Sequence, residues 1–173
     1  MVFIGRYTHS LDSKGRLVVP QNMRETLTPD GKTEALKKFV LTASPDEDSL
    51  HLYTPQDWSN MMSSVAPTHH IPDRETLKFL RAVARYTQPV DVDQLGRINL
   101  PDDLRAMADL GDEAIWIGAT NHAEIWNPKR WKEAKSQERE LGALWDARSR
   151  GETGSMDAGG LHGQTPGEKP DIS

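Results

Sequence analysis

Two copies of one short pattern decide the fold of this chain. The first is Asp12-Ser-Lys-Gly-Arg-Leu-Val-Val-Pro20, and the second is Asp93-Gln-Leu-Gly-Arg-Ile-Asn-Leu-Pro101. Aspartate, glycine, arginine and proline stand at the same places in both, and an arginine follows four positions after each proline (Arg24 and Arg105). A long pattern that recurs within one chain predicts two tandem copies of one structural unit.

Each copy predicts a turn, a strand and a short helix, in that order. An aspartate side chain accepts hydrogen bonds from nearby backbone amides and glycine tolerates a positive φ, so Asp-x-x-Gly-Arg is typical of a tight turn. Leu17 and Val19 alternate with Val18, which is the period of a half-buried strand. Pro20 ends that strand and favours the first turn of a helix.

Later segments of the two copies also correspond: 39–43 with 115–119, 50–53 with 123–126, and Thr54-Pro55 with Asn127-Pro128. The first two matches predict a pair of strands in each copy. The third has a capping residue before a proline, which predicts a closing helix. The repeated unit is therefore predicted to be ββαββα.

The expected fold class is α+β, mainly β, built from these tandem ββαββα repeats. One unit alone would expose strand edges and an apolar face, so it would be only marginally stable. We therefore expect the two units to interlock their hairpins around a pseudo-two-fold axis. This arrangement would bury both apolar faces and bring the two Asp-x-x-Gly-Arg turns onto related surfaces.

A further helix is predicted between the units, over residues 73–86 with Asp73 as its N-cap. Leu77, Leu80 and Ala84 form its apolar stripe. A second stripe consists of four basic residues, Arg74, Lys78, Arg81 and Arg85. This basic stripe is interpreted either as a solvated face or as a surface that meets phosphate or another subunit.

Composition limits the function classes. The 173 residues carry a net charge of −5, which argues against nucleic-acid binding by the overall field but leaves a local basic face possible. Cysteine is absent, which suits a reducing compartment, and no signal peptide or bilayer-length apolar segment is recognisable. We therefore expect a cytoplasmic protein.

No chemistry typical of an enzyme stands out. The chain has no Ser-His-Asp spacing, Walker loop, dinucleotide-binding glycines or zincin helix, so we predict that it is not an enzyme and takes no cofactor. His69 and His70 are adjacent and point apart on an ordered backbone, so no metal site is expected there. A small-molecule substrate and a membrane are likewise not expected as partners.

The chain is predicted to divide into four segments. Residues 1–66 are the first unit, 67–87 the connecting helix, 88–148 the second unit with a C-terminal helix, and 149–173 a disordered tail. The tail is rich in glycine and has no aromatic residue, so it could bury too little surface to offset its ordering entropy.

The pattern Gly5-x-Tyr-x-His-Ser-Leu-Asp-x-Lys-Gly-Arg-Leu-x-x-Pro20, with its second copy at 93–101 and Glu124-Ile-Trp126, resembles the MraZ family. The resemblance covers residues 1 to about 145. It implies tandem AbrB-like swapped-hairpin units that make one barrel-like domain. It also implies an oligomeric ring that associates with the nucleoid. Such a ring would act as a transcriptional regulator, binding short direct repeats in the promoter of the division and cell-wall gene cluster.

The resemblance also implies which residues contact DNA. The DNA-contacting turn corresponds to residues 12–16, and its second copy to 93–97. The predicted DNA-binding residues are Lys14, Gly15, Arg16 and Arg97, and the predicted turn-ordering residues are Asp12 and Asp93.

The chemistry of the side chains suggests their roles. A guanidinium fork suits phosphate or the O6 and N7 atoms of guanine, which we assign to Arg16, whereas Lys14 acts as a point charge on phosphate. Leu95 stands where the first turn has Lys14, so the first turn is favoured as the main contact. The alternative for Arg16 is an ion pair with Asp12 inside the turn.

Two other functions remain open from the sequence. An AbrB-like antitoxin or regulator would share the fold, although such chains typically carry one unit. A structural ring whose loops bind a protein partner is the second alternative. A steep loss of affinity with salt would distinguish DNA binding from a protein interface.

Overall fold

The computed structural model describes residues 2–26, 38–46, 48–65, 73–137 and 149–150. The predictions for His69, His70 and nearly all of the 149–173 tail therefore fall outside the described residues. Residues 1–136 form one compact unit.

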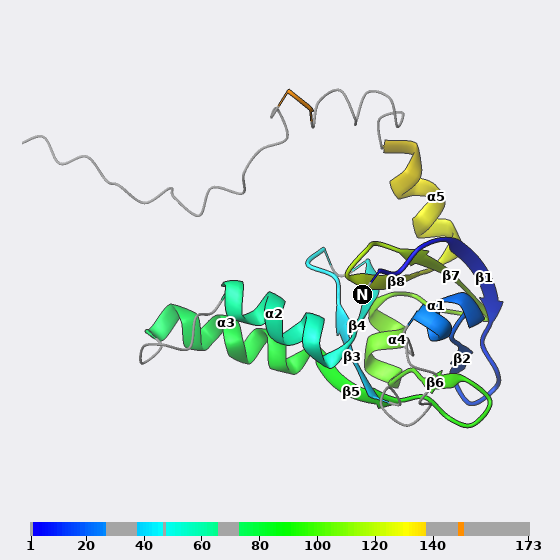
Figure 1. The fold of residues 1–173 in the computed structure, drawn as a ribbon, viewed down its shortest axis with the longest axis horizontal. Coiled ribbons are helices and arrows are strands. Elements are labelled where there is room, and N and C mark those ends of the chain that lie inside the picture. The colour runs from blue at the N-terminus through cyan, green and yellow to red at the C-terminus, as the bar shows by residue number, and fades with distance from the viewer. Residues whose placement is uncertain (1, 27–37, 47, 66–72, 138–148, 151–173) are drawn as a thin grey trace, which may run out of the picture. The chain divides into compact units, whose positions relative to one another are not determined.

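The order of elements repeats, as the sequence predicts (Figure 1). The first repeat consists of β1 (Arg6–Ser10), β2 (Arg16–Val18), α1 (Gln21–Thr26), β3 (Lys38–Ala43), β4 (Ser49–Tyr53) and α2 (Pro55–Val65). Helix α3 (Arg74–Arg85) follows. The second repeat consists of β5 (Thr87–Asp91), β6 (Arg97–Asn99), α4 (Asp102–Met107), β7 (Glu113–Gly118), β8 (His122–Trp126) and α5 (Pro128–Gln137).

The two repeats interlock through their strands. The large antiparallel sheet has the order β1-β7-β8-β4-β3-β5, and β2 pairs with β6 in a separate two-stranded ribbon. The first strand of each repeat thus lies beside the hairpin of the other repeat, because β1 pairs with β7 and β5 pairs with β3. Exchanging the repeats leaves both strand orders unchanged, which confirms the predicted fold class and the interlocked hairpins.

Alternation along the strands separates the core from the outside of the sheet. Leu50 and Leu52 of β4 and Ala123 and Ile125 of β8 have no solvent exposure, while His51 between the two leucines is half-buried. In the ribbon, Leu17, Ile98 and their neighbours Val19 and Leu100 are also buried. Each repeat therefore contributes to one shared core, whose burial provides the main driving force for folding.

The helix starts follow the predicted capping chemistry. Thr54 Oγ1 accepts the backbone N–H of Asp57 at 3.0 Å at the start of α2. Asn127 Oδ1 accepts the N–H of Lys129 at 2.7 Å at the start of α5, and Asp73 Oδ1 accepts that of Thr76 at 2.7 Å in α3. Each bond satisfies a backbone donor that a helix leaves unpaired at its first turn.

Helix α3 is only shallowly packed. It has no fully buried residue, and its half-buried side chains are Thr76, Leu80 and Val83. Leu77 and Ala84, which the sequence assigns to the packed stripe, are instead exposed, Leu77 at 38%. Phe79 is also exposed, at 43%. The four basic residues predicted on the other stripe, Arg74, Lys78, Arg81 and Arg85, are all exposed.

Candidate nucleic-acid interface

The first Asp-x-x-Gly-Arg turn is closed by backbone bonds and by one carboxylate. The carbonyl oxygen of Asp12 accepts the N–H of Gly15 at 2.9 Å, and Arg16 O accepts the N–H of Asp12 at 2.9 Å. Asp12 Oδ1 also accepts the N–H groups of Lys14 at 2.9 Å and Arg16 at 3.0 Å. Gly15 has a φ of +72°, a region in which a side chain is unfavourable.

The second turn is built in the same way. Asp93 O accepts the N–H of Gly96 at 2.9 Å, and Asp93 Oδ1 accepts those of Leu95 and Arg97, each at 2.9 Å. Gly96 has a φ of +76°. Identical local bonds in two places follow from the repeated sequence, because every partner lies within four residues of the aspartate.

Each aspartate also holds the arginine of its own turn. Arg16 Nε donates to Asp12 Oδ2 at 2.7 Å and its Nη2 lies 2.7 Å from the same oxygen, while Arg97 binds Asp93 Oδ2 through the same two nitrogens at 2.8 and 2.7 Å. The hydrogen bonds from the Arg16 side chain and backbone lower the pKa of Asp12 to about 2, and those from Arg97 lower the pKa of Asp93.

This pairing is the alternative that the sequence leaves open for Arg16. It does not exclude a second acceptor, because a guanidinium has five N–H donors and Asp12 occupies only part of them. The side chain of Arg16 is 32% exposed and that of Arg97 is 21% exposed, so both remain accessible at the surface.

The structure brings the two turns together. Arg97 Nη1 lies 3.5 Å from Asp12 Oδ2, across 85 residues of sequence. The ribbon sets this distance, because β2 and β6 pair in antiparallel register with Leu17 opposite Ile98. Arg16 and Arg97 therefore belong to one surface and not to two separate ones.

Two arginines that the sequence does not assign to the site join it. The guanidinium of Arg105 lies against Gly15, and that of Arg24 lies against Gly96, so each turn is covered by an arginine of the other repeat. Arg24 Nε donates to Val19 O at 3.1 Å, and Arg105 Nη2 lies 3.0 Å from Asp102 Oδ1. Their recurrence four residues after each proline is the sequence signal that could have identified them.

Backbone bonds also cross between the repeats at the turns. Gly15 O accepts the N–H of Leu100 at 3.0 Å, and Gly96 O accepts the N–H of Val19 at 2.9 Å. Each turn is thus held by the strand end of the other repeat, which gives the pair a defined relative position.

The tips of the two turns differ. Lys14 is exposed, and its ammonium forms no ion pair with any described residue. Leu95 is 68% exposed at the corresponding position. Five basic side chains, Lys14, Arg16, Arg24, Arg97 and Arg105, thus gather around three carboxylates, those of Asp12, Asp93 and Asp102, in a chain whose overall charge is negative.

Comparison with known proteins defines the family. The family model described as an antitoxin-like MraZ protein matches residues 2–79 and 83–146, so each repeat has its own match. The chain belongs to the MraZ family. The described helices include none that is both long and apolar enough to span a membrane.

Several curated relatives named Transcriptional regulator MraZ align with most of this MraZ-family chain. The relative from Dictyoglomus turgidum is 37% identical over 150 residues, which covers 83% of this chain and 91% of the relative. The relative from Thermomicrobium roseum is 38% identical over 130 residues, covering 75% and 84%. That from Acetivibrio thermocellus is 31% identical over 137 residues, covering 79% and 89%. The family is one of transcriptional regulators and not of enzymes, which confirms both predictions.

Proposed function

We propose that this chain binds double-stranded DNA in a sequence-specific manner through its two paired turns. The observation that carries the proposal is the contact between Arg97 and Asp12, which makes one basic surface out of both turns. A surface of this kind can attract phosphate locally even though the chain carries a net charge of −5.

Arg16 is the main DNA-contacting residue in this proposal. Asp12 holds its Nε and Nη2 atoms, so the fork is oriented before DNA arrives and loses less entropy on binding. The remaining N–H groups can meet a phosphate or the O6 and N7 atoms of guanine. Lys14 adds a point charge on phosphate, and Gly15, which is buried against the Arg105 guanidinium, supports the contact by permitting the tight turn. Arg97 extends the same contact from the second turn.

We further propose that several chains act together as a ring on short direct repeats. One pair of turns offers few phosphate contacts, so one chain should bind weakly. Linking several chains raises overall affinity by roughly 10²- to 10⁴-fold when the DNA repeats are spaced by about 10 bp. Exposed apolar side chains at Leu77 and Phe79 of α3 are available for contacts between chains.

The regulated site that we propose is the promoter of the division and cell-wall gene cluster. In this proposal the protein works in the cytoplasm in association with the nucleoid. The family membership supports regulation of transcription, and the paired turns supply the chemistry for contact with DNA.

A mobility-shift experiment tests the proposal. The probe is the DNA upstream of the chain's own gene, and the variant is Arg16→Ala, with Arg81→Ala as the matched control on α3. We expect Arg16→Ala to weaken binding at least about fivefold, since a lost bidentate arginine contact costs about 1–3 kcal/mol. Arg81→Ala, which removes the same charge elsewhere, should bind like the wild type.

The opposite result would contradict this assignment. If Arg81→Ala abolishes the shift and Arg16→Ala does not, the basic stripe of α3 is the DNA-binding surface. Light scattering on both variants should report the wild-type mass, so that a loss of binding is not a loss of assembly.

A further inference from the structure

A second cluster of polar side chains lies on the other face of the large sheet. His51 of β4 stands opposite Glu124 of β8 in the strand register, and His122 is two residues before Glu124 on the same strand. Since neighbouring residues point to opposite faces of a sheet, the buried Leu50, Leu52, Ala123 and Ile125 turn these three side chains away from the core.

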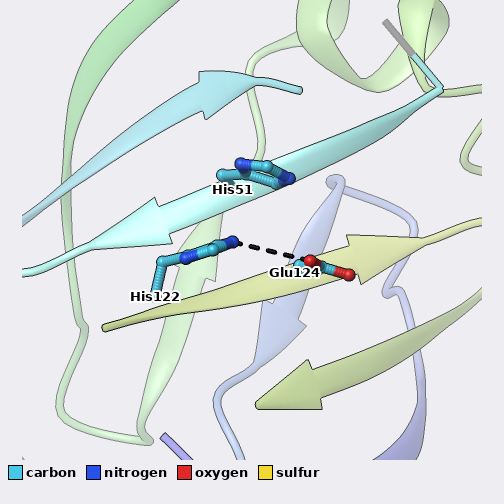
Figure 2. Close-up of side chains that lie close together, drawn as sticks. All are labelled: His51, His122 and Glu124. Atoms are coloured by element: carbon cyan, nitrogen blue, oxygen red, sulfur yellow. Dashed lines mark ion pairs between the residues drawn. The ribbon is translucent and has the colours of Figure 1, made fainter. Parts of the chain in front are cut away.

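The three side chains converge (Figure 2). One nitrogen of each histidine and one oxygen of Glu124 all lie within 4.8 Å of one another. His122 Nε2 is 3.5 Å from Glu124 Oε1, and the ring centroids of His51 and His122 are 4.5 Å apart. The cluster is sheltered, because the side chain of His122 is only 16% exposed and that of Glu124 only 21%.

Neighbouring groups leave one lone pair of His122 available. Asn121 Oδ1 lies 2.9 Å from His122 Nδ1, and because an amide oxygen only accepts, this contact favours the tautomer with the proton on Nδ1. His122 Nε2 is enclosed and faces Glu124 Oε1 at 3.5 Å, so in that tautomer its lone pair is available to an ion held between the two groups. A histidine that donates one ring N–H to an outer acceptor and presents the other nitrogen is typical of metal sites.

Glu124 is held in a similar way. Trp126 Nε1 donates to its Oε2 at 2.7 Å, which leaves Oε1 directed at His122. On the other side of the cluster, the hydroxyl of Tyr53 is 3.5 Å from His51 Nδ1. Each member of the cluster therefore has an outer partner, as ligands of a bound metal ion usually do.

We propose that His51, His122 and Glu124 bind a divalent transition-metal ion, with Zn²⁺ as the best-suited probe. Two imidazoles and one carboxylate form a ligand set that zinc accepts, with a fourth position left for water. Imidazole suits zinc, whereas Ca²⁺ and Mg²⁺ prefer oxygen ligands alone. Ligands of a tetrahedral zinc ion are about 3.3 Å apart, close to the present separation of His122 and Glu124. Rotation of the His51 side chain would complete the set.

The ion would join the two repeats. His51 comes from the first repeat and the other two ligands from the second, and β4 and β8 are the strands through which the two hairpins meet. Only the folded state brings these residues together, so binding stabilises that state in proportion to the logarithm of ion concentration. The site lies on a different sheet from the paired turns, so it is independent of the proposed DNA contact.

The experiment is a calorimetric titration of ZnCl₂ into the tag-free, chelator-treated full chain. We expect one ion per chain, with no comparable binding of MgCl₂. His51→Asn and Glu124→Gln should each weaken Zn²⁺ binding at least about tenfold. Substituting even a residue that only hydrogen-bonds to a metal ligand typically lowers metal affinity by about that factor. Thermal unfolding of the wild type should move to higher temperature with Zn²⁺, and that of Glu124→Gln should not.

Other histidines provide the control. His9→Asn and the double variant His69→Asn/His70→Asn remove imidazoles outside the cluster and should bind Zn²⁺ like the wild type. Co²⁺ in place of Zn²⁺ should give the visible absorption of a tetrahedral ion in the wild type and lose it in Glu124→Gln.

Two results would overturn the proposal. One is a folded wild type that binds no Zn²⁺; the other is Zn²⁺ binding that survives Glu124→Gln and disappears in His69→Asn/His70→Asn. Circular dichroism verifies the fold of each variant. If His51→Asn fails to fold, Glu124→Gln decides whether the cluster binds Zn²⁺, because this substitution keeps the size of the side chain.

Discussion

Arg97 Nη1 of the second turn lies 3.5 Å from Asp12 Oδ2 of the first. That carboxylate oxygen also receives two nitrogens of Arg16, so Asp12 serves the arginines of both turns. A change at Asp12 therefore affects the whole paired surface, whereas Asp93 holds only the arginine of its own turn among the described residues.

Asp12 should make stability depend on pH in the acid range. The hydrogen bonds from Arg16 lower its pKa from 3.8 to about 2, so folding favours the ionised carboxylate. The ionised carboxylate contributes fully to the free energy of unfolding when the pH is above the pKa of Asp12 in the unfolded chain. That contribution is lost as the pH falls through the pKa in the folded protein. We expect the difference in urea midpoint between wild type and Asp12→Asn to be constant above about pH 5 and to shrink between pH 4 and 2.

The difference in urea midpoint between wild type and Asp93→Asn should also shrink at low pH, since hydrogen bonds from Arg97 lower the pKa of Asp93. A difference between wild type and Asp12→Asn that stays the same from pH 7 to pH 2 would show that the ion pair with Arg16 adds nothing to folding.

Gly15→Ala should destabilise the fold. The φ of +72° is unfavourable for alanine, and the new Cβ would meet the guanidinium of Arg105. We expect a loss of about 1–2 kcal/mol in the free energy of unfolding, measured by urea denaturation. Gly96→Ala should cost a similar amount because Arg24 takes the corresponding place.

Gly111→Ala is the matched control for this prediction. Nothing lies within 4 Å of a Cβ at position 111, so the free energy of unfolding should stay within about 0.5 kcal/mol of the wild type. Equal effects at positions 15 and 111 would argue against a tight approach of Arg105 to the first turn.

The tips of the turns should set the salt dependence of DNA binding. Lys14→Ala removes an exposed charge, so the slope of log affinity against log salt should become shallower by about 0.9 for each chain in contact with DNA. Leu95→Lys should steepen the slope by the same amount if the second turn also approaches phosphate.

A slope unaffected by either substitution would favour the alternative of a ring whose loops bind a protein partner. If Leu95→Lys alone leaves the salt slope unchanged, only the first turn contacts DNA, which is the turn that the sequence favours.

Apolar side chains on α3 should contribute to assembly. Leu77 and Phe79 are 38% and 43% exposed, on a helix with no buried residue. We expect Leu77→Glu/Phe79→Glu to lower the mass measured by light scattering and to weaken DNA binding by roughly 10²-fold or more through lost avidity. Ala82→Glu, at an exposed position of the same helix, should leave the mass unchanged. An unchanged mass in the double variant would assign assembly to another surface.

Much of the fold could be predicted because the same sequence pattern occurs twice, at residues 12–20 and 93–101. Strand alternation around Leu17 and Ile98, the prolines that open α1 and α4, and the caps at Thr54, Asp73 and Asn127 are all local features. The packed side of α3 was predicted less well. The spacing of Leu77 fits an apolar helical stripe, but its burial depends on which other elements pack against α3.

The candidate site divides in the same way. The local bonds that close the turns around Asp12 and Asp93 follow from the sequence alone, because those bonds join each aspartate to residues within four positions of itself. The contact of Asp12 with Arg97 does not, because 85 residues separate the two. The covering arginines, Arg24 and Arg105, and the meeting of His51 with Glu124 depend on which strands of one repeat pair with which strands of the other. Only the tertiary structure decided those pairings, because periodicity tells which face of a strand is buried and carries no information about its neighbour in the sheet.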